Sequence, residues 1–568
     1  MNHFPDWYGY LTAEWRYLFV TILAALTGGL CGALLNPPVT ASEAATFFST
    51  LATIEASIFA IVFSVIVIAI RLVANKYSSR LPSIFLREPL YRITFTLFVI
   101  AIAVNLLGLY LSPLASQTAR NAWVGMSVGI AAVSIATLYR FIRTVITRST
   151  PEGVITAIVE RELDPQTYVP QYESERPSDR EHPHLVLFSL TSEAIEENEL
   201  ETAEQGVDGF GSVLDKTLEY VNSEENRVDD EVVDGIFKHV LEHYFPILML
   251  GAADNHRTDL SSDLAEISQQ VGERGLETKH QCLAKYSATG LADVFDELPH
   301  SFEVESFRQK LYDTLLELSL RSAEQADYKT FREIFRSLDH QLTVYLRRTP
   351  EIDYTQRVVS SHYLGSTKKI LDPLLERYGN ELDSSTLNWI RSETNDESEF
   401  PAAAKSLRYL WRRRTSFTQT VLQYRVTTGQ YPFAEGSISD GWKELVEKSA
   451  EASVPGLATL FCTSMIRAAY AVWQIEGRLI GRWTNDLALI RRDVDVDIVD
   501  CAFELVIDGT RPRSGDISHY FGGRGQNSEQ GLISRILGNG SQGPEDLESW
   551  AEQYHQEVID KTKSLEEN

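Results

Sequence analysis

The sequence predicts an all-α protein that combines a four-helix transmembrane bundle with a large α-helical cytoplasmic domain. Three observations lead to this fold class. Apolar runs long enough to cross a bilayer occur within the first 148 residues. Beyond them, apolar residues recur at intervals of three and four, and strand-like alternation is scarce. The chain of 568 residues is also long enough to form several hydrophobic cores.

Four apolar segments are expected to cross the membrane. A hydrocarbon core about 30 Å thick is spanned by about 20 helical residues. The stretch between the first and second segments contains no Lys or Arg as far as Thr50, so we expect an external loop there. The predicted spans cover approximately residues 17–35, 52–73, 93–112 and 122–146.

Basic residues predict the orientation of these spans. They gather between the second and third spans, at Arg71, Lys76, Arg80, Arg87 and Arg92. Cytoplasmic loops carry an excess of Lys and Arg, so this loop should face the cytoplasm. The same rule places both chain termini in the cytoplasm, and it predicts a multi-pass protein of the cell membrane.

The rest of the chain is expected to divide further. The predicted parts are a membrane domain at 1–148, a connecting helix and linker at 149–184, a helical-hairpin cytoplasmic domain at 185–428, and a C-terminal helical region at 429–568 with a Gly-rich loop at 509–543. Thr150 and Pro151 predict a helix start, because Pro needs no hydrogen-bond partner at the first helical position.

One later segment is apolar enough to resemble a fifth span. It runs from Pro455 to Ile475 and contains Arg467 in its middle. A charge at the centre of a transmembrane helix is costly. We therefore expect a buried cytoplasmic helix.

Three similar eight-residue segments suggest helical hairpins. They lie at 195–202, 271–278 and 323–330, and in each a helix is expected to stop at a polar turn before a second helix begins near a Thr. The intervals between them are unequal, so a regular array is not predicted. A solenoid-like hairpin repeat and ordinary amphipathic helices that share a turn both remain open.

The charge of the chain limits its partners. The formal net charge is -27, with 14 Lys against 38 Arg. An acidic, Lys-poor surface suits a halophilic cytoplasm, and the alternative is an ordinary acidic face. Either surface argues against nucleic acid as a partner. The sequence predicts no disulfide framework, because its four cysteines are scattered: Cys31, Cys282, Cys462 and Cys501. We also expect no cofactor.

Three polar side chains lie within the apolar spans, at Glu55, Asn105 and Ser127. Antiparallel spans bring them to similar depth, and polar groups in a membrane prefer each other to lipid. They could line the vestibule of a pore. Alternatively, Glu55 reaches the interface and Asn105 supports a helix contact.

Two pairs of small residues predict close helix packing. Gly28 with Gly32 and Gly125 with Gly129 are each four residues apart on an apolar helix. Such pairs let backbones approach closely. The contact could lie within one chain or between two copies.

A weak metal motif occurs at His239-Val-Leu-Glu242-His243. On a helix the two His would share a face, and Glu242 could act as a base, but a zinc site would need a further ligand. An ordinary surface His pair is the preferred interpretation. We therefore predict no catalytic residue and no enzyme activity.

A basic cluster interrupts the acidic domain, at Arg408, Arg412, Arg413 and Arg414. These side chains could bind the anionic inner leaflet of the membrane. They could instead pair with carboxylates of the same domain.

The turn after the second span resembles a known family. Tyr77-Ser78-Ser79-Arg80-Leu81 is similar to a Tyr-Ser-Pro-Arg-Leu motif, and Phe85-Leu86-Arg87-Glu88 is similar to the Phe-Leu-Arg-Asp that follows it. Both belong to an uncharacterised family of predicted membrane proteins, and the resemblance covers residues 54–109. It implies a multi-span inner-membrane protein without a known activity. From their position, Tyr77, Arg80 and Arg87 are expected to contact lipid headgroups and to couple the spans to the cytoplasmic domain.

These features favour a membrane-anchored interaction or sensor module. The alternative is an oligomeric ion channel or transporter gated by its cytoplasmic domain. The expected partners are the lipid bilayer, further copies of the chain and a cytoplasmic protein.

Overall fold

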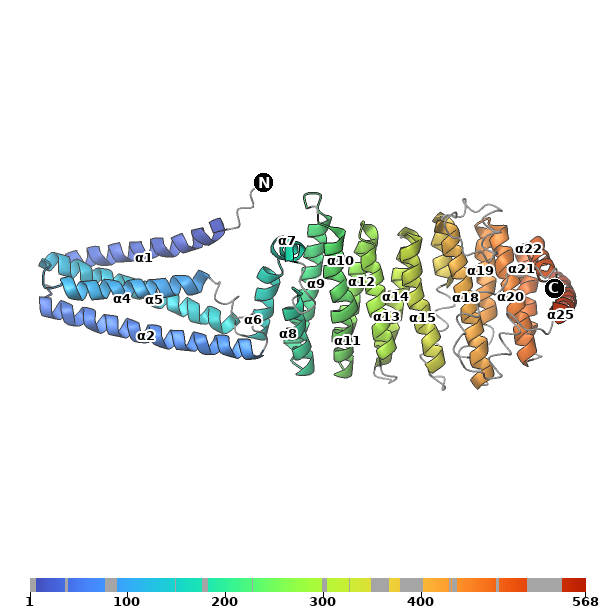
Figure 1. Ribbon diagram of the computed structural model, residues 1–568, viewed down its shortest axis with the longest axis horizontal. Coiled ribbons are helices and arrows are strands. Elements are labelled where there is room, and N and C mark those ends of the chain that lie inside the picture. Colours follow the sequence, from blue (N-terminus) through green and yellow to red (C-terminus); the bar gives the residue numbers. More distant parts are fainter. Residues whose placement is uncertain are drawn as a thin grey trace. The chain divides into compact units, whose positions relative to one another are not determined.

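The computed structural model shows a helical protein (Figure 1). It describes residues 7–35, 39–76, 89–148, 150–175, 182–226, 228–298, 304–325, 327–348, 367–377, 402–428, 431, 437–476, 480–507 and 544–567. Every regular element in these ranges is a helix, as the sequence predicts. Two compact units are present: unit 1 comprises residues 1–172 and 180–213, and unit 2 comprises 173–179 and 214–568. The finer division into four parts stays a prediction.

Four long helices form most of unit 1. They are α1 (Trp7–Leu35), α2 (Ala41–Lys76), α4 (Pro89–Leu111) and α5 (Gln117–Arg148). Helix α1 packs along α5, α2 packs along α4, and α4 also contacts α5. Among the described residues, three segments are long and apolar enough to cross a membrane: Ala41–Ser64, Ile93–Leu111 and Gln117–Thr144. A shorter apolar segment, Phe19–Leu34, lies in α1.

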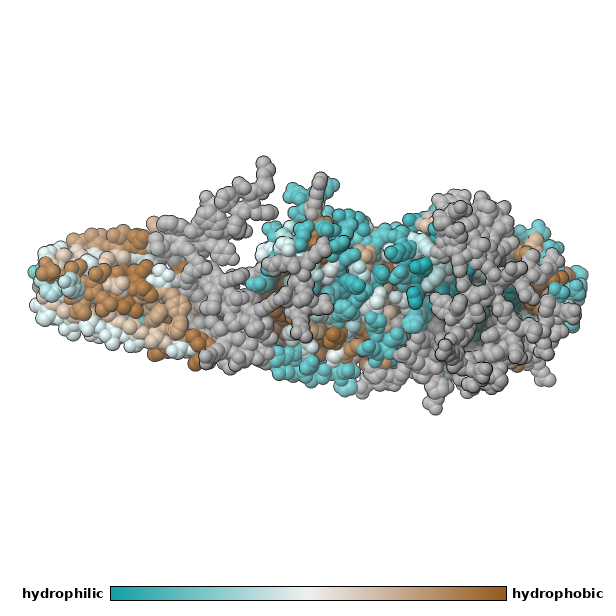
Figure 2. Space-filling view, in the orientation of Figure 1, coloured by the Kyte–Doolittle hydropathy of each residue, from teal (hydrophilic) through white to brown (hydrophobic). Residues whose placement is uncertain are grey.

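The outer surface of these helices is apolar. Large hydrophobic side chains are exposed on all four of them, which a water-soluble core helix would bury. Figure 2 shows this hydrophobic surface over the helices of unit 1. The exposed side chains include Phe19, Leu26 and Leu34 on α1, Ile61 on α2, Leu106 and Tyr110 on α4, and Ile135 and Tyr139 on α5.

Helix α2 begins earlier than the predicted second span. Residues 41–50 are helical, although the sequence led us to expect a loop there. The cause is a capping box, in which the Glu43 carboxylate accepts a hydrogen bond from the Thr40 backbone N–H (2.9 Å) and the Thr40 hydroxyl accepts one from the Glu43 N–H (3.3 Å).

Shorter helices follow α5 in unit 1. Thr150 caps α6 (Pro151–Ala157) by accepting the Gly153 N–H, which confirms the predicted helix start. A π-helix (Ile158–Glu162) continues it, followed by α7 (Pro165–Glu175) and α8 (Leu185–Glu196). Helix α7 lies within the segment 149–184, where the sequence predicts a connecting helix and linker. The buried side chains of Tyr168 and Val169 stabilise this helix despite its internal Pro170.

The described elements of unit 2 are helices, and α9 (Leu200–Asn222) extends into this unit. The remaining elements are α10 (Asp230–His239), η3 (Val240–Tyr244, a π-helix), α11 (Phe245–Asp254), α12 (Thr258–Glu277), α13 (Cys282–Glu297), α14 (Glu305–Gln325), α15 (Tyr328–Arg348), α18 (Ala402–Thr428), α19 (Ser437–Glu451), α20 (Pro455–Glu476), α21 (Ile480–Asp493), α22 (Val496–Ile507) and α25 (Pro544–Glu566).

From α12 to α15, successive helices alternate between two layers. Helix α12 contacts α13 and α14, whereas α13 contacts α14 and α15. Helices α12 and α14 therefore form one layer, and α13 and α15 form the other (Figure 1). Apolar side chains such as Leu264, Leu291 and Leu315 are fully buried among these helices.

Three helix turns share one backbone motif. Asn198, His256 and Ser453 have φ values of 57°, 59° and 60° after α8, α11 and α19. In each turn, the next residue donates its N–H to the carbonyl five positions earlier, as from Arg257 to Ala252 (2.8 Å). This is the Schellman motif, which ends a helix and reverses the chain.

The apolar segment from Pro455 forms the buried helix α20. Leu457, Phe461 and Met465 are inaccessible to solvent within unit 2. The segment is not among the described helices that could span a membrane. The Gly-rich stretch at 509–543 lies outside the described residues.

Candidate functional site

A buried polar pair joins α2 and α4 in unit 1. Asn105 Nδ2 donates a hydrogen bond of 2.7 Å to Glu55 Oε2. Only 4% of Glu55 and 1% of Asn105 are exposed. The pair therefore lies inside the packed helices, and Glu55 does not extend to the surface of unit 1.

The surrounding helix faces explain why both side chains point inward. Phe48, Ala52 and Glu55 follow one another at helical spacing and are all buried on α2. Ala101 and Asn105 lie four residues apart on the facing surface of α4. Each polar group thus occupies a position that an apolar residue would otherwise fill.

Two oxygen atoms of the pair lack a hydrogen-bond partner. Glu55 Oε1 and Asn105 Oδ1 are both buried without a partner among the described residues. A buried acceptor without a donor costs about 1–3 kcal/mol, and more if it carries a charge. The pair is therefore half satisfied by the protein itself.

Ser127 lies nearby on α5 without a hydrogen bond to the pair. Trp123 Nε1 donates a hydrogen bond to the Val104 carbonyl (3.2 Å), so residue 123 of α5 lies beside residue 104 of α4. Ser127 is one helical turn, about 6 Å, further along α5. Its hydroxyl is buried and has no partner in the described part of the chain. The predicted polar residues thus form one pair and one separate hydroxyl.

The predicted glycines lie at the contact between α1 and α5 of the same chain. A Cβ atom on Gly28 would lie 2.3 Å from the Gly125 carbonyl oxygen, and one on Gly129 would lie 2.3 Å from the Ala24 oxygen. A Cβ on Gly32 would meet the Asn121 oxygen at the same distance. Only glycine permits this backbone approach.

The basic cluster lies on α18 inside unit 2. Arg408, Arg413 and Arg414 are buried, and Arg412 is half-buried. Arg413 forms an ion pair with the buried Asp339 of α15. Arg414 stacks over the Trp442 ring at 5.6 Å and donates to the Thr367 hydroxyl. The three buried side chains are therefore not available to a lipid surface.

The predicted His pair lies where α10 becomes π-helical. The rings of His239 and His243 are 5.1 Å apart, and Glu242 lies 4.0 Å from Lys238 Nζ. Burial raises the pKa of Glu242 above its usual value. The described residues bring no third His, Cys, Asp or Glu together with the pair as a metal-binding group.

The turn after α2 is not described. Tyr77, Arg80 and Arg87 lie outside the described residues, so their expected contacts with lipid headgroups stay predictions.

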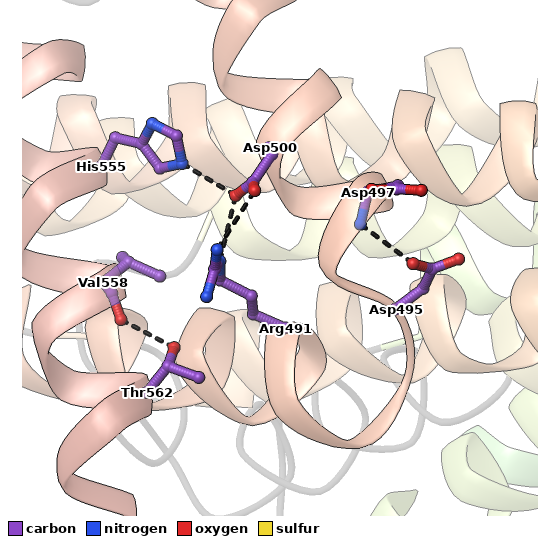
Figure 3. A network of polar contacts seen from close by, with 7 residues as sticks. All are labelled: Arg491, Asp495, Asp497, Asp500, His555, Val558 and Thr562. Atoms are coloured by element: carbon purple, nitrogen blue, oxygen red, sulfur yellow. Dashed lines mark hydrogen bonds and ion pairs between the residues drawn. The ribbon is translucent and has the colours of Figure 1, made fainter. Parts of the chain in front are cut away.

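One polar network was missed by sequence reasoning (Figure 3). Arg491 of α21 donates two hydrogen bonds to the Asp500 carboxylate of α22, at 3.0 and 3.1 Å. The other contact to Asp500 comes from His555 Nε2 of α25, at 2.9 Å. The network joins three helices, but its members have no common spacing in the sequence.

Together, the fold and the buried pair define a class of protein. The apolar, exposed helices of unit 1 indicate a helical membrane protein, and unit 2 supplies a large helical domain.

The comparison with protein families agrees with this class. Residues 12–230 match the model of a family described as predicted membrane protein (DUF2254). The match contains α2, α4 and the turn between them, on which the sequence resemblance rests. No curated protein and no solved structure matches the chain.

Proposed function

We propose that this protein is a membrane-anchored interaction module. Four transmembrane helices, α1, α2, α4 and α5, hold it in the bilayer as a bundle. Both termini and the stacked helices of unit 2 face the cytoplasm, where unit 2 binds a protein partner and has no catalytic role of its own. The layered packing of α12 to α15 carries this proposal, because stacked helix pairs form continuous binding surfaces.

The two layers offer two different surfaces. In the first layer, Lys310 Nζ of α14 lies 3.7 Å from Glu266 Oε2 of α12. In the second layer, Lys285 Nζ of α13 lies 3.1 Å from Glu333 Oε2 of α15. The two lysines are similarly accessible, at 40% and 37% of their side chains. They are therefore a matched pair of positions from which to test each surface.

Photo-crosslinking in native membranes tests the proposal. A photoreactive amino acid replaces Lys310 or Lys285 in the full chain, and each position loses only a surface ion pair worth about 0–1 kcal/mol. We expect a discrete crosslinked species from one layer and none from the other. Reversing the charge of Glu266 or Glu333 in the same layer should then weaken that crosslink. No crosslink from either layer contradicts a binding role.

An acidic surface also supports a halophilic setting for this module. At a net charge of -27, many carboxylates repel one another. Salt at about 1 M weakens this repulsion, because it shortens the Debye length to about 3 Å. We expect the protein to become more stable as the salt concentration rises. A stability that is independent of salt would support the ordinary acidic surface instead.

A second function is an oligomeric channel or transporter gated by unit 2. The observation that favours it is the buried Glu55–Asn105 pair, because ionisable residues inside membrane helices commonly serve ion pathways. Ion flux into liposomes that contain the protein tests this function. If the protein is a channel, we expect an oligomer in lipid nanodiscs and an ion flux that falls in the Glu55→Gln variant. A monomer without flux contradicts it.

A further inference from the structure

The strongest unexplained feature is the incomplete hydrogen bonding of Glu55 and Asn105. The structure records one bond between them, from Asn105 Nδ2 to Glu55 Oε2 (2.7 Å). The second oxygen of each group, Glu55 Oε1 and Asn105 Oδ1, has no partner among the described residues. Both atoms are acceptors when Glu55 is ionised, so they cannot satisfy each other.

No positive charge compensates Glu55 among the side chains that the structure describes. Asn105 is its recorded hydrogen-bond partner, and no salt bridge to Glu55 is present there. On α4, residues 93–111 contain no charged side chain. On α5, Arg120 donates to the carbonyls of Ser112 and Ala115 at one end, while Arg140 and Arg143 are exposed towards the other. An ionised Glu55 would thus be an isolated buried charge, which costs far more than a neutral group.

One proton satisfies both free oxygens. A carboxylic acid and a primary amide can form two parallel hydrogen bonds, one from the amide N–H and one from the acid O–H. The first of these is present. The second requires that Glu55 Oε1 carry a hydrogen, which Asn105 Oδ1 would then accept.

We propose that Glu55 and Asn105 form a reversible proton-binding site within the membrane helices. An O–H bond forms between Glu55 Oε1 and a proton taken from water, and the charge of the site changes from -1 to 0. Asn105 positions the acid by holding Oε2 and accepts the new O–H through Oδ1. A sodium ion would need several more oxygen ligands than one carboxylate and one amide, so a proton is the occupant that fits.

This site goes beyond the interaction function and rests on the proposed bilayer position of α2 and α4. Release of the protein by alkaline carbonate would contradict that bilayer position. A negative result in the experiments below would contradict only the proton site, so the two failures can be distinguished.

Infrared spectroscopy of the full chain in lipid nanodiscs tests the site. At pH 7, we expect a carbonyl band of a protonated carboxyl group that disappears in Glu55→Gln. This variant keeps the amide pair hydrogen-bonded, because its Nε2 can donate to Asn105 Oδ1. The band should persist in Glu43→Gln, which alters an exposed carboxyl group on the same helix. It should shift in Asn105→Ala, which removes the bond to Oε2.

Two results would overturn the proton site. One is an identical protonated-carboxyl region in the wild type and Glu55→Gln at pH 7. The other is loss of the band when sodium replaces a large organic cation at constant pH, which would assign the site to a metal cation.

A labelling experiment on the wild type needs no variant to fold. Dicyclohexylcarbodiimide is apolar and reacts with protonated carboxyl groups. Mass spectrometry should locate its adduct at Glu55, and the rate should fall about tenfold for each pH unit above the midpoint of titration. A rate at Glu55 that is independent of pH, or adducts confined to other carboxyl groups, would contradict the proposal.

Discussion

At the residue scale, Asp500 shows how one carboxylate joins three helices. It accepts hydrogen bonds from Arg491 and contacts His555, whose ring also stacks on Phe503 at 4.4 Å. Burial raises the pKa of Asp500, but the hydrogen bonds and charges of Arg491 and His555 lower it more. The net pKa lies below the usual value, so the network favours the ionised form.

Asp500→Asn should loosen the C-terminal helix α25. The variant removes the charge that holds Arg491 and His555, and partial exposure limits the loss to about 1 kcal/mol. Backbone amides of Pro544–Glu566 should then exchange hydrogen about five times faster. Asp560→Asn is a matched control, because the Asp560 side chain is exposed on α25 itself and accepts a hydrogen bond from Gln556. Equal exchange in both variants would argue against the network.

The effect of Asp500 should depend on pH with a defined sign. A carboxylate with a lowered folded pKa stabilises the protein above its unfolded pKa, which is about 3.9. That stabilisation is lost as the pH falls through the folded value. We therefore expect the difference between wild type and Asp500→Asn to be constant from pH 5 to 7 and to shrink below about pH 4. A difference that grows in acid would contradict this assignment.

At the element scale, helix packing depends on a few backbone contacts. The π-helix at Val240–Tyr244 precedes Pro246, which has no N–H for the usual helical hydrogen bond. Gly290 of α13 packs directly on the Leu241 carbonyl there. The wider helix and the missing side chain let two helices approach.

Gly290→Ala should destabilise unit 2. A Cβ atom at this position would lie 2.0 Å from the Leu241 oxygen, which is backbone and cannot rotate away. We expect a loss of about 1–3 kcal/mol in the free energy of unfolding. In Gly481→Ala, by contrast, the new methyl meets nothing within 4 Å, and helix propensity should make this control neutral or slightly stabilising. Chemical denaturation in detergent measures both.

Gly125→Ala should separate α1 from α5. Its Cβ atom would lie 2.1 Å from the Gly28 oxygen, whereas a Cβ on Gly29 meets its nearest atom at 3.4 Å. Gly125→Ala should therefore raise hydrogen exchange in α1, and Gly29→Ala should not. If the two variants behave alike, close packing of α1 on α5 does not stabilise unit 1.

Across the whole molecule, the two units differ in the kind of side chain that they expose. Hydrophobic side chains are exposed over the long helices of unit 1, and polar side chains prevail over α10 to α15 (Figure 2). This contrast suits unit 1 to contact with lipid and unit 2 to contact with water.

Natural cysteines can test the proposed orientation. Cys501 on α22 is exposed, whereas Cys462 on α20 is buried. Burial also raises the pKa of the Cys462 thiol, which lowers its reactivity. A membrane-impermeant maleimide should label Cys501 only after the membrane is opened, and Cys501→Ser should remove the label that mass spectrometry locates there. Labelling of Cys501 in intact cells would place unit 2 outside.

Features that depend on a local pattern of residues could be predicted from the sequence. Apolar runs showed the helices of unit 1, and their isolated polar residues showed Glu55 and Asn105 as candidates. The helix start at Thr150 also followed from two adjacent residues. The early start of α2 is also encoded locally, in the Thr40–Glu43 capping box, which precedes the apolar run.

Features that depend on which helix faces meet could be seen only in the folded protein. Helix α7 forms within the predicted connecting segment at 149–184, because Tyr168 and Val169 are buried. Arg413 pairs with Asp339, a residue far away in the sequence. The Glu55–Asn105 bond likewise requires the rotation of α2 against α4 to be fixed. Sequence periodicity gives the face of a single helix, whereas a partner across space is set by packing of the whole unit.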